Sequence, residues 1–159
     1  MSKKILGVSA LFHDAAVALI DDDQIVFAGH SERYGPKVKL DKHINPELMK
    51  DCLKHGKPDE IAWYEKPLKK KQRQIYAGEW KQALQSNSPK KYMKPYFNGS
   101  IDGLLKHNPP LSTHEHHYSH ACAGYYTSPF RDATIVVIDA IGEWDTLTIW
   151  EAKDQKITK

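Results

Sequence analysis

The sequence has few of the features that define several common classes of protein. Its 159 residues include only two cysteines, Cys52 and Cys122, and these form no CxxC or zinc-knuckle spacing. Cysteines of this kind are typical of reduced, partly buried thiols in a cytosolic protein. No apolar run approaches the roughly 20 residues that span a bilayer, and the first one is interrupted by His13 and Asp14. We therefore expect a soluble, cytoplasmic protein with no signal peptide and no membrane contact.

The chain also lacks a strong net charge. Its 23 Lys and Arg residues and 20 Asp and Glu residues give a formal charge of +3, and much of the basic excess lies between Lys66 and Lys94. A basic run of this kind can contact phosphates. It is more often a solvated helix face, and the sequence has no RNA- or DNA-reading motif. A nucleic-acid-binding module is therefore the weakest of the functions considered, and we do not expect nucleic acid as a partner.

The chain has the length of one domain, and its pattern predicts an α/β fold with a mixed sheet. Strands are expected over residues 3–11 and over 15–30, the latter forming a hairpin with the acidic tip Asp21–Asp23. Asn45 followed by Pro46 predicts the start of a helix that Gly56 ends. Ile61 and Trp63 should point to one side of a short strand. Helices are also expected over residues 72–85 and 100–107.

Near the C-terminus, the sequence predicts a helix over about 116–126 and then two strands that flank the segment "DAIGEWDT". The last residues, "KDQKITK", look like a turn and an unfinished strand. A hairpin alone is only marginally stable. We therefore expect the chain from about Ile135 onward to pack on the preceding part of the chain or to pair with another chain.

Histidine is concentrated in one place, with four residues among the seven positions of "HEHHYSH", residues 114–120. His116 and His120 are four apart, so on a helix they share one face and can bind one metal ion. His117 points about 100° away and is a poorer third ligand. By itself the HxxxH pair is more often a surface or capping feature than a metal site.

Asp139 is the best candidate for a third ligand. It ends the apolar run "TIVVI", and a carboxylate at the end of a buried strand is not explained by solubility alone. Two histidines and one carboxylate suit ferrous iron and also accept zinc or manganese. An isolated aspartate in such a position is more often a turn or cap residue, so it is the combination that favours a metal site.

Two blocks of the sequence resemble a known family. "ILGVSALFHDAAVALIDDDQIVFAGHSER" is similar to the pattern "ILGISxxxHDSAxxLxxDGxIxxAxxEER" of carbamoyltransferases of the nodulation-protein and antibiotic-tailoring type. "HHYSHACAGYYTSPFRDATIVVIDAIGEWDT" is similar to the same family's "HHxxHAxSAxxxSPFxxAxIxxxDGxGEWxT". The two blocks occur in the family's order and together cover much of the chain.

The resemblance implies a fold and a reaction. The fold would be an actin/hexokinase-like (ASKHA), ribonuclease-H-like first lobe over residues 1–130, followed by the opening hairpin of a truncated second lobe over 131–159. Such enzymes transfer a carbamoyl group from carbamoyl phosphate to a hydroxyl through an ATP-derived carbamoyl-adenylate. Substrates would therefore be small molecules, with ATP and carbamoyl phosphate among them, and the bound metal would be Fe(2+) or another divalent ion.

The resemblance also assigns roles to individual residues. It places His116, His120 and Asp139 as metal ligands and His13 as the residue that handles a proton or contacts the acyl group. It assigns substrate or nucleotide binding to a further set: Asp14, Glu32, Arg33, Lys39, Gly142 and Glu143. The sequence departs from the pattern at Ala15, where serine is usual, and at Ala140, where glycine is common.

Length leaves the function of this chain open, because family members are several times longer. One hypothesis is a carbamoyltransferase N-terminal region that needs a C-terminal chain or a homo-oligomer to complete its site. The alternative is a non-catalytic remnant or regulatory fragment that still binds metal or nucleotide. The sequence does not identify the carbamoyl acceptor.

Overall fold

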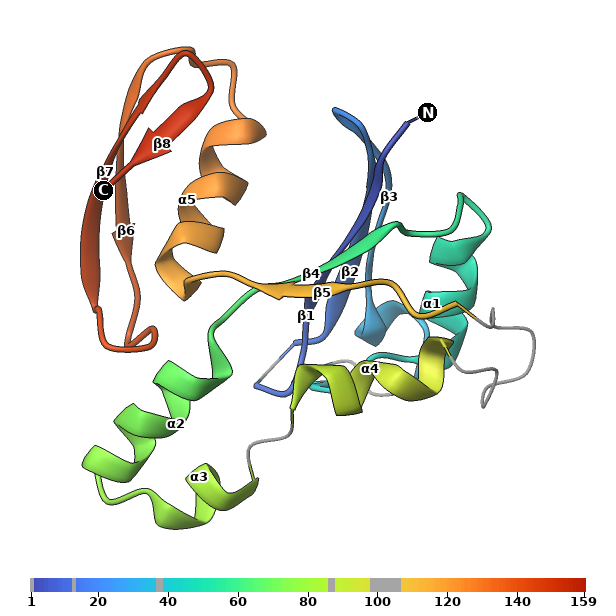
Figure 1. The fold of residues 1–159 in the computed structure, drawn as a ribbon, viewed down its shortest axis with the longest axis horizontal. Coiled ribbons are helices and arrows are strands. Elements are labelled where there is room, and N and C mark those ends of the chain that lie inside the picture. The colour runs from blue at the N-terminus through green and yellow to red at the C-terminus, as the bar shows by residue number, and fades with distance from the viewer. Residues whose placement is uncertain (1, 13, 37–38, 86–87, 98–106) are drawn as a thin grey trace. The chain divides into compact units, whose positions relative to one another are not determined.

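The computed structural model describes residues 2–12, 14–36, 39–85, 88–97 and 107–159 (Figure 1). The chain forms two compact units, each built from two separate stretches. The first unit contains Met1–Trp63 and Asn87–Ser112, and the second contains Tyr64–Ser86 and Thr113–Lys159. The predicted lobe boundary between residues 130 and 131 refers to a family fold and stays a prediction.

A five-stranded sheet in the order β3-β2-β1-β4-β5 dominates the first unit. Its strands are β1 (Lys4–Ser9), β2 (Ala16–Asp21), β3 (Gln24–His30), β4 (Glu60–Trp63) and β5 (Leu111–Thr113). β1, β2 and β3 are antiparallel neighbours, whereas β4 runs parallel to β1, so the sheet is mixed as predicted. The turn between β2 and β3 uses Asp22 at a φ of 52°, which confirms the acidic hairpin tip.

Two helices complete the first unit. α1 (Pro46–Leu53) begins where expected, since the Asn45 side chain accepts a hydrogen bond from the Glu47 backbone N–H. It contacts β2 and β3 and buries Leu48, Met49 and Cys52. α4 (Pro89–Phe97) is hydrogen-bonded to the segment just before α1, because the Tyr96 hydroxyl donates to the Ile44 carbonyl at 2.7 Å.

The second unit has its own small sheet, in which β6 (Ala133–Ile138), β7 (Leu147–Lys153) and β8 (Lys156–Thr158) are antiparallel in that order. α5 (His116–Tyr126) packs against β6 and β7 (Figure 1). The core between them is formed by Ala121, Tyr125, Val137, Trp150, Ala152 and Ile157. The hairpin therefore packs on the preceding helix, as expected.

The turn and short strand predicted for the last residues are confirmed, because Asp154 and Gln155 adopt φ values of 48° and 63° and form a tight turn that returns the chain as β8. One expectation about local structure is wrong. The single helix expected over 72–85 is two helices, α2 (Pro67–Tyr76) and α3 (Trp80–Gln85). Gly78, at a φ of 76°, lies in the break between them.

The helix expected over 100–107 falls mostly outside the described residues. Within the described part of the chain, no helix is both long enough and apolar enough to cross a membrane.

Candidate metal centre

The helix α5 places the two predicted histidine ligands on one face. It begins at His116, after Glu115 in extended conformation, and continues through His120, so the two side chains are one turn apart. Their rings meet edge to face with centroids 4.7 Å apart. His116 lies mostly buried, with 14% of its side chain exposed, whereas His120 is 54% exposed. The pair thus has one buried and one solvent-facing member.

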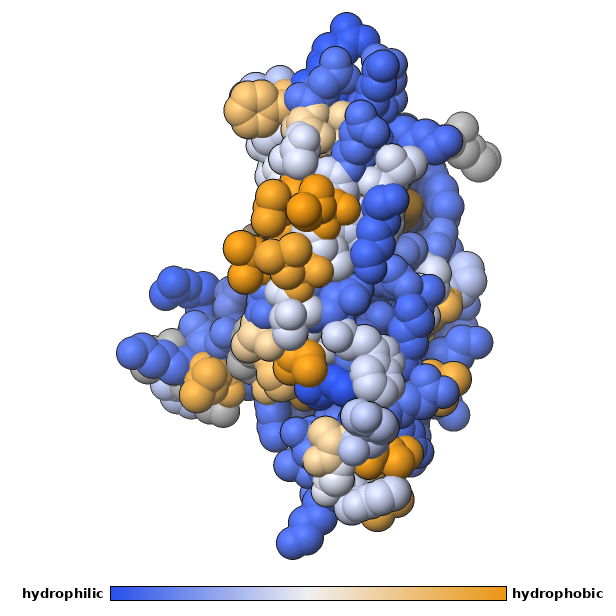
Figure 2. All heavy atoms as spheres, turned by 90° about the vertical axis from the view of Figure 1, so that its left-hand side faces the viewer, coloured by the Kyte–Doolittle hydropathy of each residue, from blue (hydrophilic) through white to orange (hydrophobic). Residues whose placement is uncertain are grey.

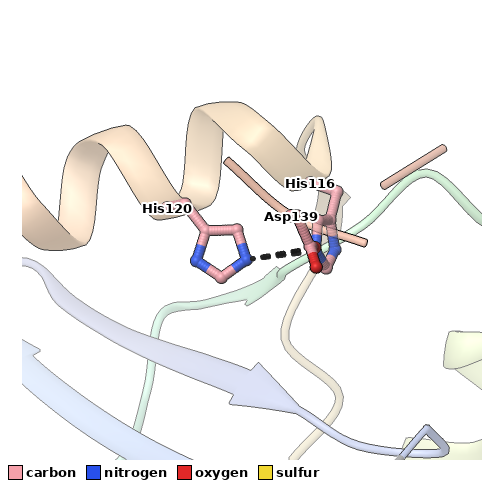
Figure 3. Close-up of side chains that lie close together, drawn as sticks. All are labelled: His116, His120 and Asp139. Atoms are coloured by element: carbon pink, nitrogen blue, oxygen red, sulfur yellow. Dashed lines mark hydrogen bonds and ion pairs between the residues drawn. The ribbon is translucent and has the colours of Figure 1, made fainter. Parts of the chain in front are cut away.

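Asp139 completes a group of three converging ligands (Figure 3). It follows directly on β6, and its backbone N–H donates to the Thr146 carbonyl across the start of the loop. Its Oδ2 lies 2.7 Å from His116 Nε2 and 3.7 Å from His120 Nε2. The two histidine Nε2 atoms are 3.1 Å apart. The strand and the helix therefore bring Asp139 next to two histidines that precede it by 23 and 19 positions in the sequence.

These separations fit a shared cation. Ligands at about 2.0–2.2 Å from one metal ion lie roughly 2.8–3.6 Å from each other in tetrahedral or octahedral arrangements. The distance of 3.1 Å lies within this range, and those of 2.7 and 3.7 Å lie just outside it, so small side-chain movements would bring all three atoms to one ion. The two short contacts of His116 Nε2, with Asp139 Oδ2 and with His120 Nε2, also favour this interpretation. The nitrogen carries at most one proton. It cannot donate that proton to Asp139 and at the same time accept one from His120. A divalent cation between the three atoms removes the conflict, and the donor set fits it.

The environment of Asp139 favours its charged form. Burial opposes ionisation, but hydrogen bonds from His116 and from the Ala140 backbone N–H outweigh it, so the pKa of Asp139 is lowered. The Ala140 N–H donates to Asp139 Oδ1 at 2.6 Å and leaves Oδ2 facing the histidines. Asp139 is thus held as a carboxylate with one oxygen directed toward His116.

His117, next in sequence to the predicted ligand His116, belongs to a buried set of polar contacts. His117 is 3% exposed, and its Nδ1 lies 2.9 Å from Thr148 Oγ1. The same oxygen accepts a hydrogen bond from Trp150 Nε1 at 2.8 Å. His117 Nε2 is buried without a hydrogen-bond partner in the described part of the chain. The sequence placed His117 off the metal face, but this buried chain of polar groups had no local signal, because Thr148 and Trp150 follow some thirty residues later.

Gly142 and Glu143 were predicted to bind substrate or nucleotide, and both are buried. The Gly142 N–H donates to the Asp145 carbonyl at 2.8 Å, so it shapes the loop. Glu143 Oε1 accepts from the Lys66 backbone N–H at 2.5 Å. Burial raises the pKa of Glu143, and the backbone N–H groups of Lys66 and His116 partly offset this rise.

The position of Glu143 explains how the loop is held. Lys66 caps α2, so the Glu143 carboxylate accepts a hydrogen bond at the N-terminus of this helix. The backbone N–H of His116, the first residue of α5, also favours the charged form of Glu143. Lys69 lies close by, with Nζ 2.5 Å from a Glu115 oxygen and 3.9 Å from Glu143 Oε2. Part of the basic run is therefore paired with acidic side chains of the same unit.

The other predicted site residues belong to the first unit and lie near one another there. Asp14 Oδ1 accepts from the Leu40 N–H at 3.2 Å, next to the exposed Lys39. Glu32 and Arg33 belong to a short 3-10 helix, η1 (Ser31–Arg33), and the Ser31 N–H that begins it donates to the Ala15 carbonyl. His13, the predicted catalytic residue, lies outside the described residues. Hydrogen bonds thus connect the segments that carry these residues, from Leu40 to Asp14 and from Ser31 to Ala15.

Comparison with known proteins defines the class. The family described as "Carbamoyltransferase N-terminus" matches residues 4–159, nearly the whole chain. The chain therefore belongs to the N-terminal region of the carbamoyltransferase family, as its two sequence blocks indicated.

The relatives are longer. An uncharacterized protein of Synechocystis sp. is 33% identical over 173 residues, which cover 97% of this chain but 28% of the relative. An uncharacterized protein of Methanocaldococcus jannaschii is 37% identical over 46 residues, or 28% of this chain and 8% of that protein. The chain thus spans little more than a quarter of the length of the cyanobacterial relative.

Proposed function

We propose that this chain supplies the metal- and nucleotide-binding part of a carbamoyltransferase that makes a carbamoyl-adenylate from ATP and carbamoyl phosphate and transfers the carbamoyl group to a hydroxyl. The observation that carries the proposal is the convergence of His116, His120 and Asp139, whose ligand atoms all lie within 4.8 Å of one another. Family membership supplies the reaction class. The preferred ion is Fe(2+), although the donor set also accepts other divalent metals.

The three ligands would hold the ion on an open face. A divalent ion bound there supplies positive charge that neutralises phosphate oxygens. The exposed side chain of His120 supports this role, because it leaves that side of the site accessible to a phosphate group. Asp139, kept ionised by its hydrogen bonds, balances the charge of the ion.

The remaining predicted residues take different roles in this proposal. Asp14, Arg33 and Lys39 are charged residues of the first unit, and they would contact substrate there. Gly142 and Glu143 contribute by holding the loop that carries Asp139, since the Gly142 N–H and the Glu143 carboxylate are already hydrogen-bonded within the protein. His13 keeps its proposed role in proton handling, which rests on the resemblance.

Turnover would require further parts of the enzyme. Adenylate formation needs ATP and the carbamoyl donor held together, and this chain corresponds to 28% of its cyanobacterial relative. The test is co-expression with the part of the Synechocystis protein that follows the matched region. Release of pyrophosphate from ATP that depends on carbamoyl phosphate is the readout. Water would first cleave carbamoyl phosphate to carbamate and inorganic phosphate, and carbamate would then displace pyrophosphate from ATP to give the carbamoyl-adenylate.

The double variant His116→Ala/His120→Ala is the matched control. It should abolish pyrophosphate release without dissociating the complex of the two co-expressed chains. Metal and nucleotide binding with no turnover by the assembled chains would overturn the proposal. That result would favour the alternative, a non-catalytic fragment that retains the fold and the metal site.

A further inference from the structure

Exposed apolar side chains in the second unit lie on an open surface. Figure 2 shows apolar side chains gathered on the solvent-facing side of the small sheet, where Ile138 and Ile149 are 75% and 57% exposed. An open sheet face offers contact area, but small molecules are usually held in concave sites that combine apolar walls with a few well-placed polar groups. A concave site with both features is found in the first unit.

A cavity of about 270 Å³ in the first unit is lined by residues of α4, by Ile61 of β4 and by the segment that leads into β5. Its floor is apolar, because Ile61, Met93 and Phe97 line it and each is 2% exposed. An apolar cavity of about 150 Å³ is large enough to hold a benzene ring. The space here therefore suits one ring with a short substituent.

Hydrogen bonds fix the wall that is formed by residues 108–111. The His107 N–H donates to the Phe97 carbonyl at 3.0 Å, and His107 Nε2 lies 2.9 Å from the Pro58 carbonyl oxygen. Further along, the Ile61 N–H donates to the Pro110 carbonyl at 2.8 Å. The wall is thus tied to the end of α4 and to β4, and it contains two prolines, whose φ angles are fixed. A ligand would therefore enter a preformed space and lose little affinity to ordering of the protein.

Two lysines of α4 give the cavity its charge. Lys90 and Lys94 line it, are one helical turn apart and are both exposed. Neither forms an ion pair with a residue in the part of the chain that the structure describes. No acidic side chain is among the described residues that line the cavity, and Asn108 adds an amide that can donate hydrogen bonds. The polar groups of the cavity are therefore suited to an anion.

The position of these lysines in α4 is unfavourable without an anion. Lys90 is the second residue of the helix, and the first turn contains no acidic residue. A positive charge near a helix N-terminus is opposed by the helix macrodipole, and like charges four positions apart repel each other. A negative charge between the two ammonium groups would relieve both effects. The helix therefore favours a negatively charged ligand over a neutral one.

We propose that this cavity binds a small organic anion with an apolar body, of the class of the monocyclic aromatic carboxylates. The ring would lie against Met93 and Phe97, since a thioether and an aromatic face are good partners for a ring. The carboxylate would lie between the Lys90 and Lys94 ammonium groups, with the Asn108 amide as a further donor. None of these residues is used in the metal, nucleotide or carbamoyl sites, so the proposal does not depend on the proposed function.

The test is a titration of the 159-residue chain with phenylacetate, measured by calorimetry and by NMR of the methyl groups. Acetate has the charge without the ring, and phenylacetamide has the ring without the charge. For phenylacetate we expect saturable binding with a Kd of about 1–10 mM, and the methyl groups of Ile61, Met93 and Leu111 should shift most. Acetate should bind at least about tenfold more weakly, because it buries no ring. Phenylacetamide should bind at least about fivefold more weakly, because it forms no ion pair.

The variant Lys90→Gln/Lys94→Gln removes both charges and keeps long polar side chains. We expect it to weaken phenylacetate binding at least about fivefold and to leave phenylacetamide binding unchanged. The matched control is Lys81→Gln/Lys91→Gln, which removes the same charge from two exposed helical lysines outside the cavity. The control should bind phenylacetate as the parent does.

Four results would overturn the proposal. These are no saturable binding of phenylacetate below about 50 mM, equal affinity for phenylacetate and phenylacetamide, equal phenylacetate affinity of the two double variants, and methyl shifts confined to residues outside the cavity. A chain that binds phenylacetate as expected but takes up no metal would contradict the proposed function and leave the anion site standing.

Discussion

Gly142 lies directly against the ring of His117. A Cβ built on Gly142 would stand 2.8 Å from His117 Cδ2 and 3.0 Å from His117 Nε2. The loop that follows Asp139 therefore packs through Gly142 against the buried imidazole of His117. His117 is next in sequence to the predicted ligand His116. Glycine is required at this position because of the close approach.

Substitution of Gly142 by alanine should disturb the packing of the loop against His117 and displace Asp139. We expect Gly142→Ala to weaken metal binding by at least about tenfold and to lower the free energy of unfolding by about 1–3 kcal/mol, as overpacking does. Metal titration and urea unfolding measure the two effects. Gly124→Ala is the control, because no atom lies within 4 Å of a Cβ there and alanine favours the helix α5. Equal behaviour of the two variants would contradict the account.

The buried contact between His117 and Thr148 should contribute measurably to stability. Thr148→Val keeps the shape of the side chain but removes the oxygen that accepts from Trp150 Nε1 and contacts His117 Nδ1. Two buried groups would then lack a partner, so we expect a loss of about 1–3 kcal/mol in urea unfolding. Thr134→Val, at an exposed position of β6, should change stability by less than about 0.5 kcal/mol. A small effect of Thr148→Val would mean that the contact is incidental.

The stability of the protein should fall in alkaline solution. Burial raises the pKa of the Cys52 thiol from 9.0 to about 12 and that of the Tyr118 hydroxyl from 10.0 to about 12. Between pH 9 and 12 the unfolded chain releases these protons and the folded chain keeps them. The stabilisation is therefore complete below about pH 9 and is lost as the pH rises toward 12.

Urea unfolding at pH 8 and pH 10.5 measures this loss. Cys52→Ala removes the thiol, so its stability should fall less steeply between the two pH values, even though the cavity lowers it at both. The same slope in parent and variant would show that Cys52 does not carry the effect.

The parts of the fold that depend on local chemistry could be predicted from the sequence. Asn45 with Pro46 specified the start of α1, and the acidic residues at 21–23 specified a hairpin. The spacing of His116 and His120 placed both on one face of α5. Each of these features is determined by residues within one or two turns of each other.

The missed features depend on contacts across the chain or on single backbone angles. Gly78 divides α2 from α3 through one positive φ, within a stretch whose composition is helical throughout. The hydrogen bond between the Lys66 backbone N–H and Glu143 joins residues 77 positions apart, which no local pattern encodes.

The most direct test of the central claim is the metal content of the chain purified without oxygen and supplied with Fe(2+). We expect close to one iron per chain in the parent and in His114→Ala, which changes a histidine outside the proposed ligand set. We expect almost none in His116→Ala/His120→Ala, since Asp139 alone cannot hold the ion. An iron-free parent, or a double variant that keeps its iron, would contradict the assignment of His116, His120 and Asp139 as a metal centre.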